Sequence, residues 1–254
     1  MPPTSNSSFR KTIVLGLGAI LLPALWLIIK YSFAVPDRFL PAPDAVLRAL
    51  FDIRPSVWLH AWQTLSRVLV GTLTGVLAGV SLGLLLLRFP FTRLLLLPSV
   101  QALRAIPPIA TVPFFLLWFG FSETGKYLLI VVGIAFNLSI ASLQILSDNP
   151  ERYTVMFRGF ALDHKKMTTA YSLPRLVEEL LPTIRFSVAT AIGLVVVSEL
   201  LGAQLGLGYL IQTARSTFSM HAVFLATILL GFISVALDGL VVYIWSKLMY
   251  WRKQ

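Results

Sequence analysis

The sequence predicts an all-α integral membrane protein with six transmembrane helices. Of its 254 residues, 57% are hydrophobic and 13% are charged, and the mean hydropathy is +0.81. These values lie far outside the composition of soluble globular proteins. Little chain is left for a separate soluble domain, so residues 1–254 are expected to form one transmembrane domain. Six segments are apolar over about the 20 residues that a helix needs to cross the hydrocarbon core: 12–31, 68–87, 94–118, 127–146, 186–203 and 222–246.

The first segment also has features of a secretory signal, because Arg10 and Lys11 precede an apolar run that extends to Ile29. The run is longer than the apolar core of a signal peptide, and no cleavage site with small residues follows it cleanly. We therefore predict a helix that is retained in the membrane.

The distribution of basic residues predicts the orientation. With the N-terminus inside, 13 Lys and Arg residues fall on the inner face and seven on the outer face, while Arg104 lies within a span. This excess follows the positive-inside rule and places both termini in the cytoplasm. It also explains a net charge of +10 without nucleic acid as a partner. The chain has no cysteine, so disulfides and thiolate metal sites are excluded.

Residues 36–62 form the outer loop after the first span. We expect Asp44 to cap a short helix there, after a proline-rich extended stretch. This helix lies either along the outer membrane interface or against the bundle as an ordinary loop helix. Four apolar residues of this helix share one face: Val46, Leu47, Leu50 and Phe51.

The second span carries a glycine at every fourth position, which aligns them on one helix face. Such a stripe permits close packing, either within the subunit or at an interface with a second subunit. The glycines are Gly71, Gly75, Gly79 and Gly83.

The third span is interrupted by prolines, and a broken helix at membrane depth is tolerated where it faces protein or a watery cavity. Arg104 lies in it, and a cation in hydrocarbon costs at least about 2.5 to 3.5 kcal/mol. Two interpretations remain open: a buried ion pair with Glu199, or a direct electrostatic effect on a permeating solute. The candidate residues for a translocation path are Gln101, Arg104, Pro107, Pro108 and Glu199.

The segment 148–185 between the fourth and fifth spans is polar. It holds six basic and five acidic residues, so it cannot lie in hydrocarbon. We expect two short helices, 151–161 and 176–181, with the break at Pro174. A long cytoplasmic loop of this kind indicates a docking surface for another protein.

No enzymatic site is evident. Gly202, Gly206 and Gly208 fit neither a phosphate-binding loop nor a dinucleotide fingerprint, and they more plainly permit tight turns and close helix approach. The three histidines have no metal-ligand spacing and form no catalytic constellation. We therefore expect a chain without a cofactor or metal of its own. If the protein works with ATP, another chain hydrolyses it.

Several motifs, in order and spacing, carry a family resemblance along nearly the whole chain. The sequence resembles a transmembrane permease subunit of bacterial ABC importers, in the branch for nitrate, sulfonates, taurine and bicarbonate. The motifs are Phe39-Leu40-Pro41-Ala42-Pro43, Leu103-Arg104-Ala105-Ile106-Pro107-Pro108-Ile109-Ala110, Pro113, Leu117-Trp118-Phe119-Gly120, residues 199–211, Asp238 and Trp251.

This resemblance implies a type I importer permease in the bacterial inner membrane. Two permease subunits, identical or different, would enclose the path, dock two cytoplasmic ABC ATPases that bind ATP, and receive a small, mostly anionic solute from an external binding protein. Segment 148–185 would hold the ATPase-coupling helix. The residues matched to it are Arg158, Gly159, Ala161, Leu162, Asp163, His164, Lys165 and Lys166.

The coupling segment departs from the family pattern. Residues 155–157 replace the family's Glu-Ala-Ala, Ala161 stands in place of its glycine, and Glu178 in place of its second proline, while the Leu173-Pro174 pair is kept. A divergent ATPase partner, a specialised subunit of a heteromer and loss of coupling all fit. Two other functions remain alternatives: a non-transporting scaffold with the same fold, and a secondary transporter.

The polar residues near membrane depth also favour a pair of permease subunits. Polar groups that face lipid are expensive, and a second subunit across a central path would shelter them. These residues are Gln101, Arg104, Asn137, Gln144, Glu199 and Asp238.

Overall fold

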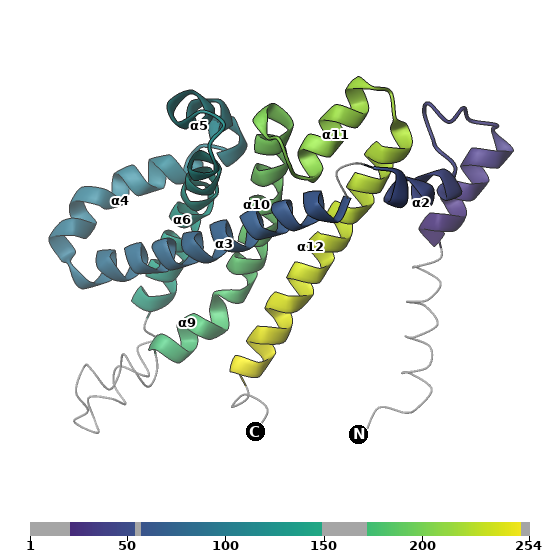
Figure 1. Cartoon of the computed structure of the whole chain (residues 1–254). Helices are drawn as coiled ribbons and strands as arrows, with labels where there is room; N and C mark the ends of the chain where they lie inside the picture. The colour runs from purple at the N-terminus through teal and green to yellow at the C-terminus, as the bar shows by residue number, and fades with distance from the viewer. Residues whose placement is uncertain (1–20, 54–56, 149–171, 250–254) are drawn as a thin grey trace, which may run out of the picture. The chain divides into compact units, whose positions relative to one another are not determined.

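The computed structural model describes residues 21–53, 57–148 and 172–249. All the regular structure in these residues is helical, as Figure 1 shows. The chain groups into two compact units. The first comprises residues 1–57 and 210–228, and the second comprises residues 58–209 and 229–254.

Four helices are long and apolar enough to cross a membrane: α3 (Val57–Arg88), α6 (Glu123–Ser147), α10 (Leu181–Gly202) and α12 (Met220–Leu248). The predicted third span is a pair of helical stretches, Pro90–Ala105 and Pro108–Phe119, that bend by 93°. If that pair is one span, the described residues hold five. The helix Leu21–Ser32 is shorter, and the rest of the first predicted span lies outside the described residues. Six spans therefore remain a prediction.

The break in the third span follows from its prolines. Helix α4 (Pro90–Ala105) ends where Ile106 is extended, because a residue before proline disfavours the helical region. A short 3-10 turn, η1 (Pro108–Thr111), and helix α5 (Val112–Phe119) then continue the chain. The predicted interruption at Pro107 and Pro108 is confirmed.

Two helix starts differ from the sequence prediction. Helix α3 begins at Val57 rather than near Val68, and α10 begins at Leu181 rather than near Phe186. Hydropathy locates the apolar part of a helix, whereas the helix itself continues through polar residues as long as its backbone bonds are made. As a consequence Arg67, which the charge count placed on the outer face just before the second predicted span, lies inside α3.

In the first unit, Trp26 joins the helix Leu21–Ser32 to the stretch that follows it. Its indole Nε1 donates to the Pro41 carbonyl at 3.1 Å, and its ring centroid lies 5.8 Å from that of Phe224. Lys30 pairs with Asp37 at 2.8 Å. The hydrogen bond and charge of Lys30 lower the pKa of the Asp37 carboxyl.

Helix α2 (Pro43–Asp52) confirms a short helix in this loop but corrects its details. Its N-cap is Ala42, because Pro43 takes the first helical position, where its missing N–H is no loss. Asp44 therefore lies in the first turn, where it pairs with Arg48 at 2.8 Å. The predicted apolar face is divided: Val46 and Ala49 are buried, whereas Leu47 and Phe51 are 62% and 82% exposed.

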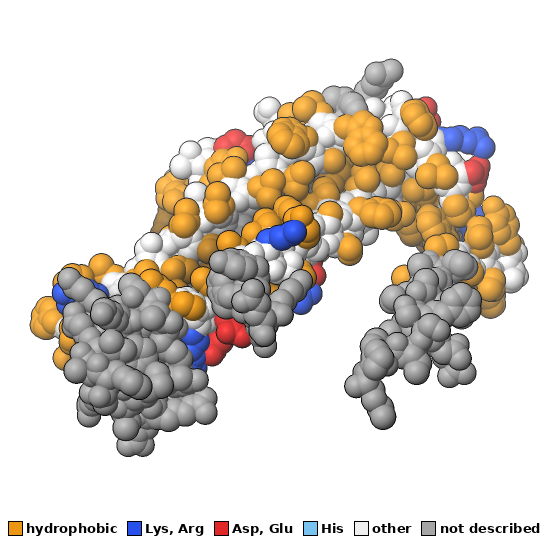
Figure 2. Space-filling view, turned by 90° about the horizontal axis from the view of Figure 1, so that it is seen from below, with side chains coloured by type: hydrophobic (Ala, Val, Ile, Leu, Met, Phe, Trp, Pro, Cys, Tyr) orange, Lys and Arg blue, Asp and Glu red, His pale blue; other side chains and the backbone are white. Residues whose placement is uncertain are grey.

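In the second unit, α6 is the central helix and contacts α10, α5, α4 and α9 (Figure 1). Residues Ile130, Ile134 and Leu138 of α6 are fully buried in its hydrophobic core. In contrast, hydrophobic side chains cover much of the surface seen in Figure 2, as expected for a protein in a lipid environment.

The glycine stripe of α3 lies against α6. A Cβ added at Gly71 or Gly75 would come within 2.6 Å of a side-chain atom of Ile130 or Ile134, respectively. Gly79 and Gly83 would clash with α6 in the same way. The stripe therefore serves contacts within the subunit, which was one of the two interpretations from the sequence.

Helix α9 (Leu173–Glu179) replaces the predicted helix 176–181. Pro174 lies in its first turn, where proline is tolerated, and so begins the helix instead of preceding it as a break. The predicted helix 151–161 lies outside the described residues.

Candidate functional site

Three polar residues of α3 are almost completely buried. His60, Thr64 and Arg67 are exposed by no more than 2%. They are spaced four and three residues apart, so they share one face of the helix. That face is turned toward the end of α10 and the turn that follows it. Burial of these groups requires that their hydrogen bonds be satisfied within the protein.

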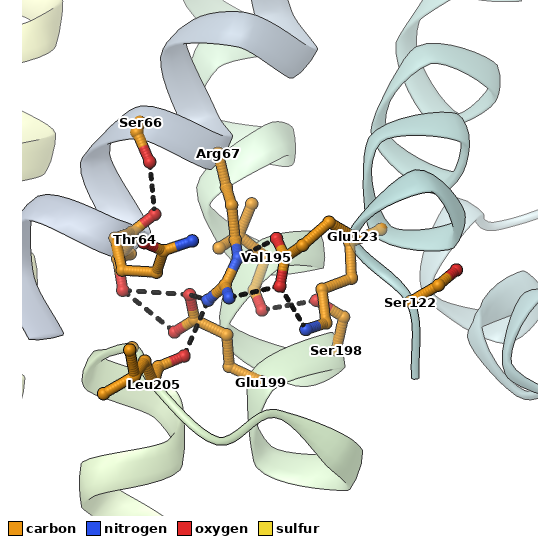
Figure 3. Close-up of polar contacts among 12 residues, drawn as sticks. Thr64, Ser66, Arg67, Ser122, Glu123, Val195, Ser198, Glu199 and Leu205 are labelled. Atoms are coloured by element: carbon orange, nitrogen blue, oxygen red, sulfur yellow. Dashed lines mark hydrogen bonds and ion pairs between the residues drawn. The ribbon is translucent and has the colours of Figure 1, made fainter. Parts of the chain in front are cut away.

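Arg67 pairs with Glu199, a carboxylate whose side chain is 0% exposed (Figure 3). The Nη1 atom of Arg67 lies 2.6 Å from Oε1 of Glu199 and donates at 2.7 Å to the Leu205 carbonyl. The Thr64 hydroxyl lies 3.0 and 2.9 Å from the two carboxylate oxygens, and the Gly208 N–H donates to Oε2 at 2.9 Å. All the groups that face Glu199 are donors, as an ionised carboxylate requires.

Arg67 also holds a second acid, Glu123, with the other side of its guanidinium. Its Nε and Nη2 atoms donate to the two oxygens of Glu123 at 2.7 and 2.6 Å, and Lys126 adds a contact of 2.9 Å. Glu123 lies in the first turn of α6, where a negative charge is favoured by the helix dipole. Its side chain is 46% exposed and lines a pocket of about 590 Å³.

The same network positions the turn between α10 and α11 (Leu207–Ser216). The Leu207 N–H donates to Thr64 Oγ1 at 2.8 Å, and the Gly206 N–H donates to His60 Nδ1 at 3.2 Å. Gly206 has a φ of +129°, and a Cβ there would lie 2.2 Å from the Glu199 carboxyl carbon. The expectation that the glycines after Glu199 permit tight turning and close approach is confirmed.

The predicted ion pair between Arg104 and Glu199 is wrong. Glu199 is neutralised by Arg67, and Arg104 is exposed without an ion pair to any described residue. The other acid near membrane depth, Asp238, also has a cation: Arg185 donates to it at 2.6 and 2.7 Å. Sequence alone did not show which helix ends meet.

The candidate path residues lie in different surroundings. Arg104 and Pro108 line a small pocket of about 50 Å³ together with Thr111 and Asn137, and Pro107 is exposed at the break before them. Glu199 is enclosed in the network described above.

A second, larger pocket lies between α4 and α6. Its volume is about 440 Å³, and Gln101 contributes to its wall. Polar residues of this pocket besides Gln101 are Arg93, Gln144, Ser147 and Asp148. Two of the predicted path residues are thus exposed at pockets along α4: Gln101 at a polar pocket, and Arg104 at a mostly apolar one.

Arg67, Thr64 and Glu123 were not among the site residues predicted from the sequence. A usable signal was present, because polar residues recur at helical spacing upstream of the apolar window, at His60, Thr64 and Arg67. The eight residues predicted to couple to an ATPase, from Arg158 to Lys166, lie outside the described residues. Among the residues that the structure does describe, no group of His, Asp and Glu side chains is arranged to hold a metal ion.

Long apolar helices and a proline-broken helix pair with pockets along it are features of a membrane transport protein. Comparison with known proteins gives the family. Residues 71–250 match the family described as "Binding-protein-dependent transport system inner membrane component". The chain belongs to this family. It is a permease subunit of an ABC importer for small solutes, and it is a transport subunit rather than an enzyme, since the ATPase is a separate chain. It works with ATPase subunits and a solute-binding protein.

Individual relatives cover nearly the whole chain. The putative aliphatic sulfonates transport permease protein SsuC of Bacillus subtilis is 30% identical, over 92% of this chain and 87% of its own. The taurine transport system permease protein TauC of Escherichia coli is 26% identical, over 91% and 86%. The formylaminopyrimidine transport permease protein ThiX of Halalkalibacterium halodurans is 25% identical, over 92% and 94%.

A solved structure supports the fold. The MetNI methionine ABC transporter in inward-facing conformations contains a chain that matches 76% of this one, with 99% of its own length covered. The TM-score is 0.58 and the sequence identity is 20%. The type I importer permease fold implied by the sequence resemblance is thereby supported.

Proposed function

We propose that this chain forms one half of the translocation path of an importer for a small anionic solute. The observation that carries the proposal is the contrast between Arg104 and three paired charged groups of the spans: Arg67, Glu199 and Asp238. Arg104 is exposed at a small, mostly apolar pocket without a described ion-pair partner, while Arg67, Glu199 and Asp238 are paired. A cation kept without a counter-ion near membrane depth favours an anion in the path.

The names of the relatives support the anionic class. Two of the similar permeases are named for aliphatic sulfonates and for taurine, which carry a sulfonate group. Nitrate and bicarbonate fit the same chemistry. The neutral amides Gln101, Asn137 and Gln144 would supply further hydrogen bonds to such a solute without adding charge.

A second permease subunit, the same chain or a related one, completes the path in this proposal. Glu199 and Asp238 no longer require it, because each has a cation within the subunit. Gln101, Arg104 and Gln144 remain exposed. The polar side chains that a second subunit would shield from lipid therefore lie on α4 and α6, where the pockets are.

The remaining elements of the proposal concern coupling and orientation. Segment 148–185 docks the ATPase through residues 158–166. ATP is bound by the partner ATPase, and this chain holds no cofactor of its own. The excess of basic residues places both termini on the cytoplasmic side of a bacterial inner membrane. A secondary transporter is disfavoured because Glu199 and Asp238, its candidate proton carriers, are ion-paired.

Uptake by the complete complex in proteoliposomes tests the path. The solute is first identified on the cognate binding protein, from nitrate, bicarbonate, taurine and aliphatic sulfonates. We expect Arg104→Ala to reduce ATP-driven uptake about tenfold, which corresponds to about 1.4 kcal/mol, and Arg104→Lys to reduce it much less. Equal uptake by the wild type and Arg104→Ala would refute a role for this charge.

A further inference from the structure

Arg175, in the first half of α9, connects that helix to the end of α6. Its Nη2 atom lies 2.6 Å from Oδ2 of Asp148, and its Nη1 atom donates to the Asp148 backbone carbonyl. Its Nε atom lies 2.6 Å from Oε1 of Glu179, one turn further along α9. One guanidinium thus holds a carboxylate and a carbonyl of α6 together with a carboxylate of its own helix.

The physical setting adds a helix-dipole contribution and apolar packing to these ion pairs. Asp148 is the C-cap of α6, so the cation lies at the negative end of the helix dipole. The Arg175 side chain is 17% exposed, whereas that of Asp148 is 68% exposed, so solvent screens the pair from the Asp148 side. Beneath it, Leu176 and Leu180 are buried in the same hydrophobic cluster as Leu146 of α6. The end of α6 and helix α9 are therefore joined by packing and by charge.

This contact joins the residues that flank the segment proposed to dock the ATPase. Asp148 directly precedes residues 149–171, and Arg175 follows them closely, so the contact joins the two ends of the segment proposed to meet the ATPase. One end continues into α6, which carries Asn137 and Gln144 of the pockets. The other end continues through α9 into α10, which carries Glu199.

We infer that Arg175 is a positioning residue for energy coupling: it makes α6 and α9 move together when the ATPase acts on the segment between them. The inference rests on the proposed ATPase docking of that segment. Without the contact, the ATPase would still bind, but its movement would displace α6 and α10 independently of each other. ATP would then be hydrolysed with less solute transported.

The test uses the complete complex of permease, ATPase and binding protein in proteoliposomes, with the solute identified on the binding protein. Three quantities are measured on Arg175→Gln: the ATPase retained with the permease, the rate of ATP hydrolysis, and solute uptake. We expect normal retention of the ATPase and a severalfold fall in uptake per ATP hydrolysed. Arg175→Lys, which keeps the charge but not the forked geometry, should retain part of the coupling.

A matched control is Arg48→Gln, which removes an exposed arginine that pairs with Asp44 in a four-residue helical spacing, outside this contact. It should leave uptake per ATP unchanged. The swap Arg175→Asp with Asp148→Arg restores the charge pair and should recover part of the coupling lost in Arg175→Asp alone. Recovery of this kind would not follow from a merely damaged fold.

Two outcomes overturn the inference, and they are distinguishable from failure of the proposed docking. Unchanged uptake per ATP in Arg175→Gln refutes the positioning role alone. Loss of the bound ATPase in that variant refutes it also, because Arg175 would then be part of the docking surface. The docking itself is tested by replacing residues 163–166 with a Gly-Ser linker: full ATP-driven uptake by that variant overturns the docking assignment and, with it, this inference.

Discussion

Arg67 and Arg104 are both arginines in helices of an apolar protein, but they differ in burial and in ion pairing. Arg67 is 2% exposed, and its guanidinium is engaged by two carboxylates and a backbone carbonyl. Arg104 is exposed at a pocket wall and has no ion pair among the described residues. A buried charge that is fully paired holds helices in place. An exposed charge without an ion pair can instead interact with a solute. Arg67 is thus a structural charge, whereas Arg104 is the charge that we propose acts on the solute.

The largest effect is expected from Arg67→Ala. It leaves the Glu199 carboxylate buried without its cation, and removal of one partner of a buried pair costs about 3 to 5 kcal/mol. The free energy of unfolding in mild detergent measures the loss. The double variant with Glu199→Ala should lose much less than the sum of the two single variants. Additive losses would show that the two residues do not stabilise each other, and Arg67 would then not differ from Arg104 as a paired charge.

A smaller effect is expected from Gly206→Ala, which tests how rigid the surroundings of Glu199 are. The added Cβ meets the Glu199 carboxyl group, and the φ of +129° is strained for alanine, so a loss of about 1 to 3 kcal/mol is expected. Gly193→Ala is the matched control, since a Cβ there meets nothing within 4 Å. Equal thermal stability of the two variants would contradict the close packing at Glu199.

Glu123→Gln should lower the free energy of unfolding by less than Gly206→Ala does, although Glu123 contacts the same arginine as Glu199. Its side chain is 46% exposed, whereas that of Glu199 is 0% exposed, and solvent weakens an exposed ion pair to about 1 kcal/mol or less. Chemical unfolding of Glu123→Gln beside Glu199→Gln measures the difference. A larger loss for Glu123→Gln would reverse the order of the two acids around Arg67.

The smallest effect on stability is expected from Arg104→Gln. Because no described contact is lost, the free energy of unfolding should change by no more than about 0.5 kcal/mol, while uptake of an anionic solute falls. Unfolding and uptake are measured on the same preparation. A variant that loses stability in proportion to uptake would place Arg104 with Arg67 as a structural charge.

The sequence allowed the apolar helices to be located, because a window of about 20 residues is long enough to average over single polar side chains. The broken third span was predictable as well, since Pro107 and Pro108 act locally on the backbone. The family followed from motifs spread along the chain. Each of these features depends on neighbours in sequence.

The partner of Glu199 was not predictable in this way. Arg67 and Glu199 are 132 residues apart, and their meeting depends on how α3, α6 and α10 pack. Hydropathy also began the predicted second span at Val68, which left Arg67 just outside it, where its burial could not be foreseen. Similarly, Asp44 was a reasonable cap by residue type, but the preference of Pro43 for the first helical position moved the helix start.

The two prolines at the start of η1, Pro107 as its N-cap and Pro108 as its first residue, have a consequence for hydration. Since neither Pro107 nor Pro108 has an N–H, the carbonyl oxygen of Arg104 has no helical donor three or four residues ahead. In hydrocarbon such an unsatisfied oxygen costs several kcal/mol. The bent backbone is therefore stable only where water, or a donor from another molecule, reaches it. Access of water, or of such a donor, to this part of the span is then a condition of its folding, whether or not a solute is passing.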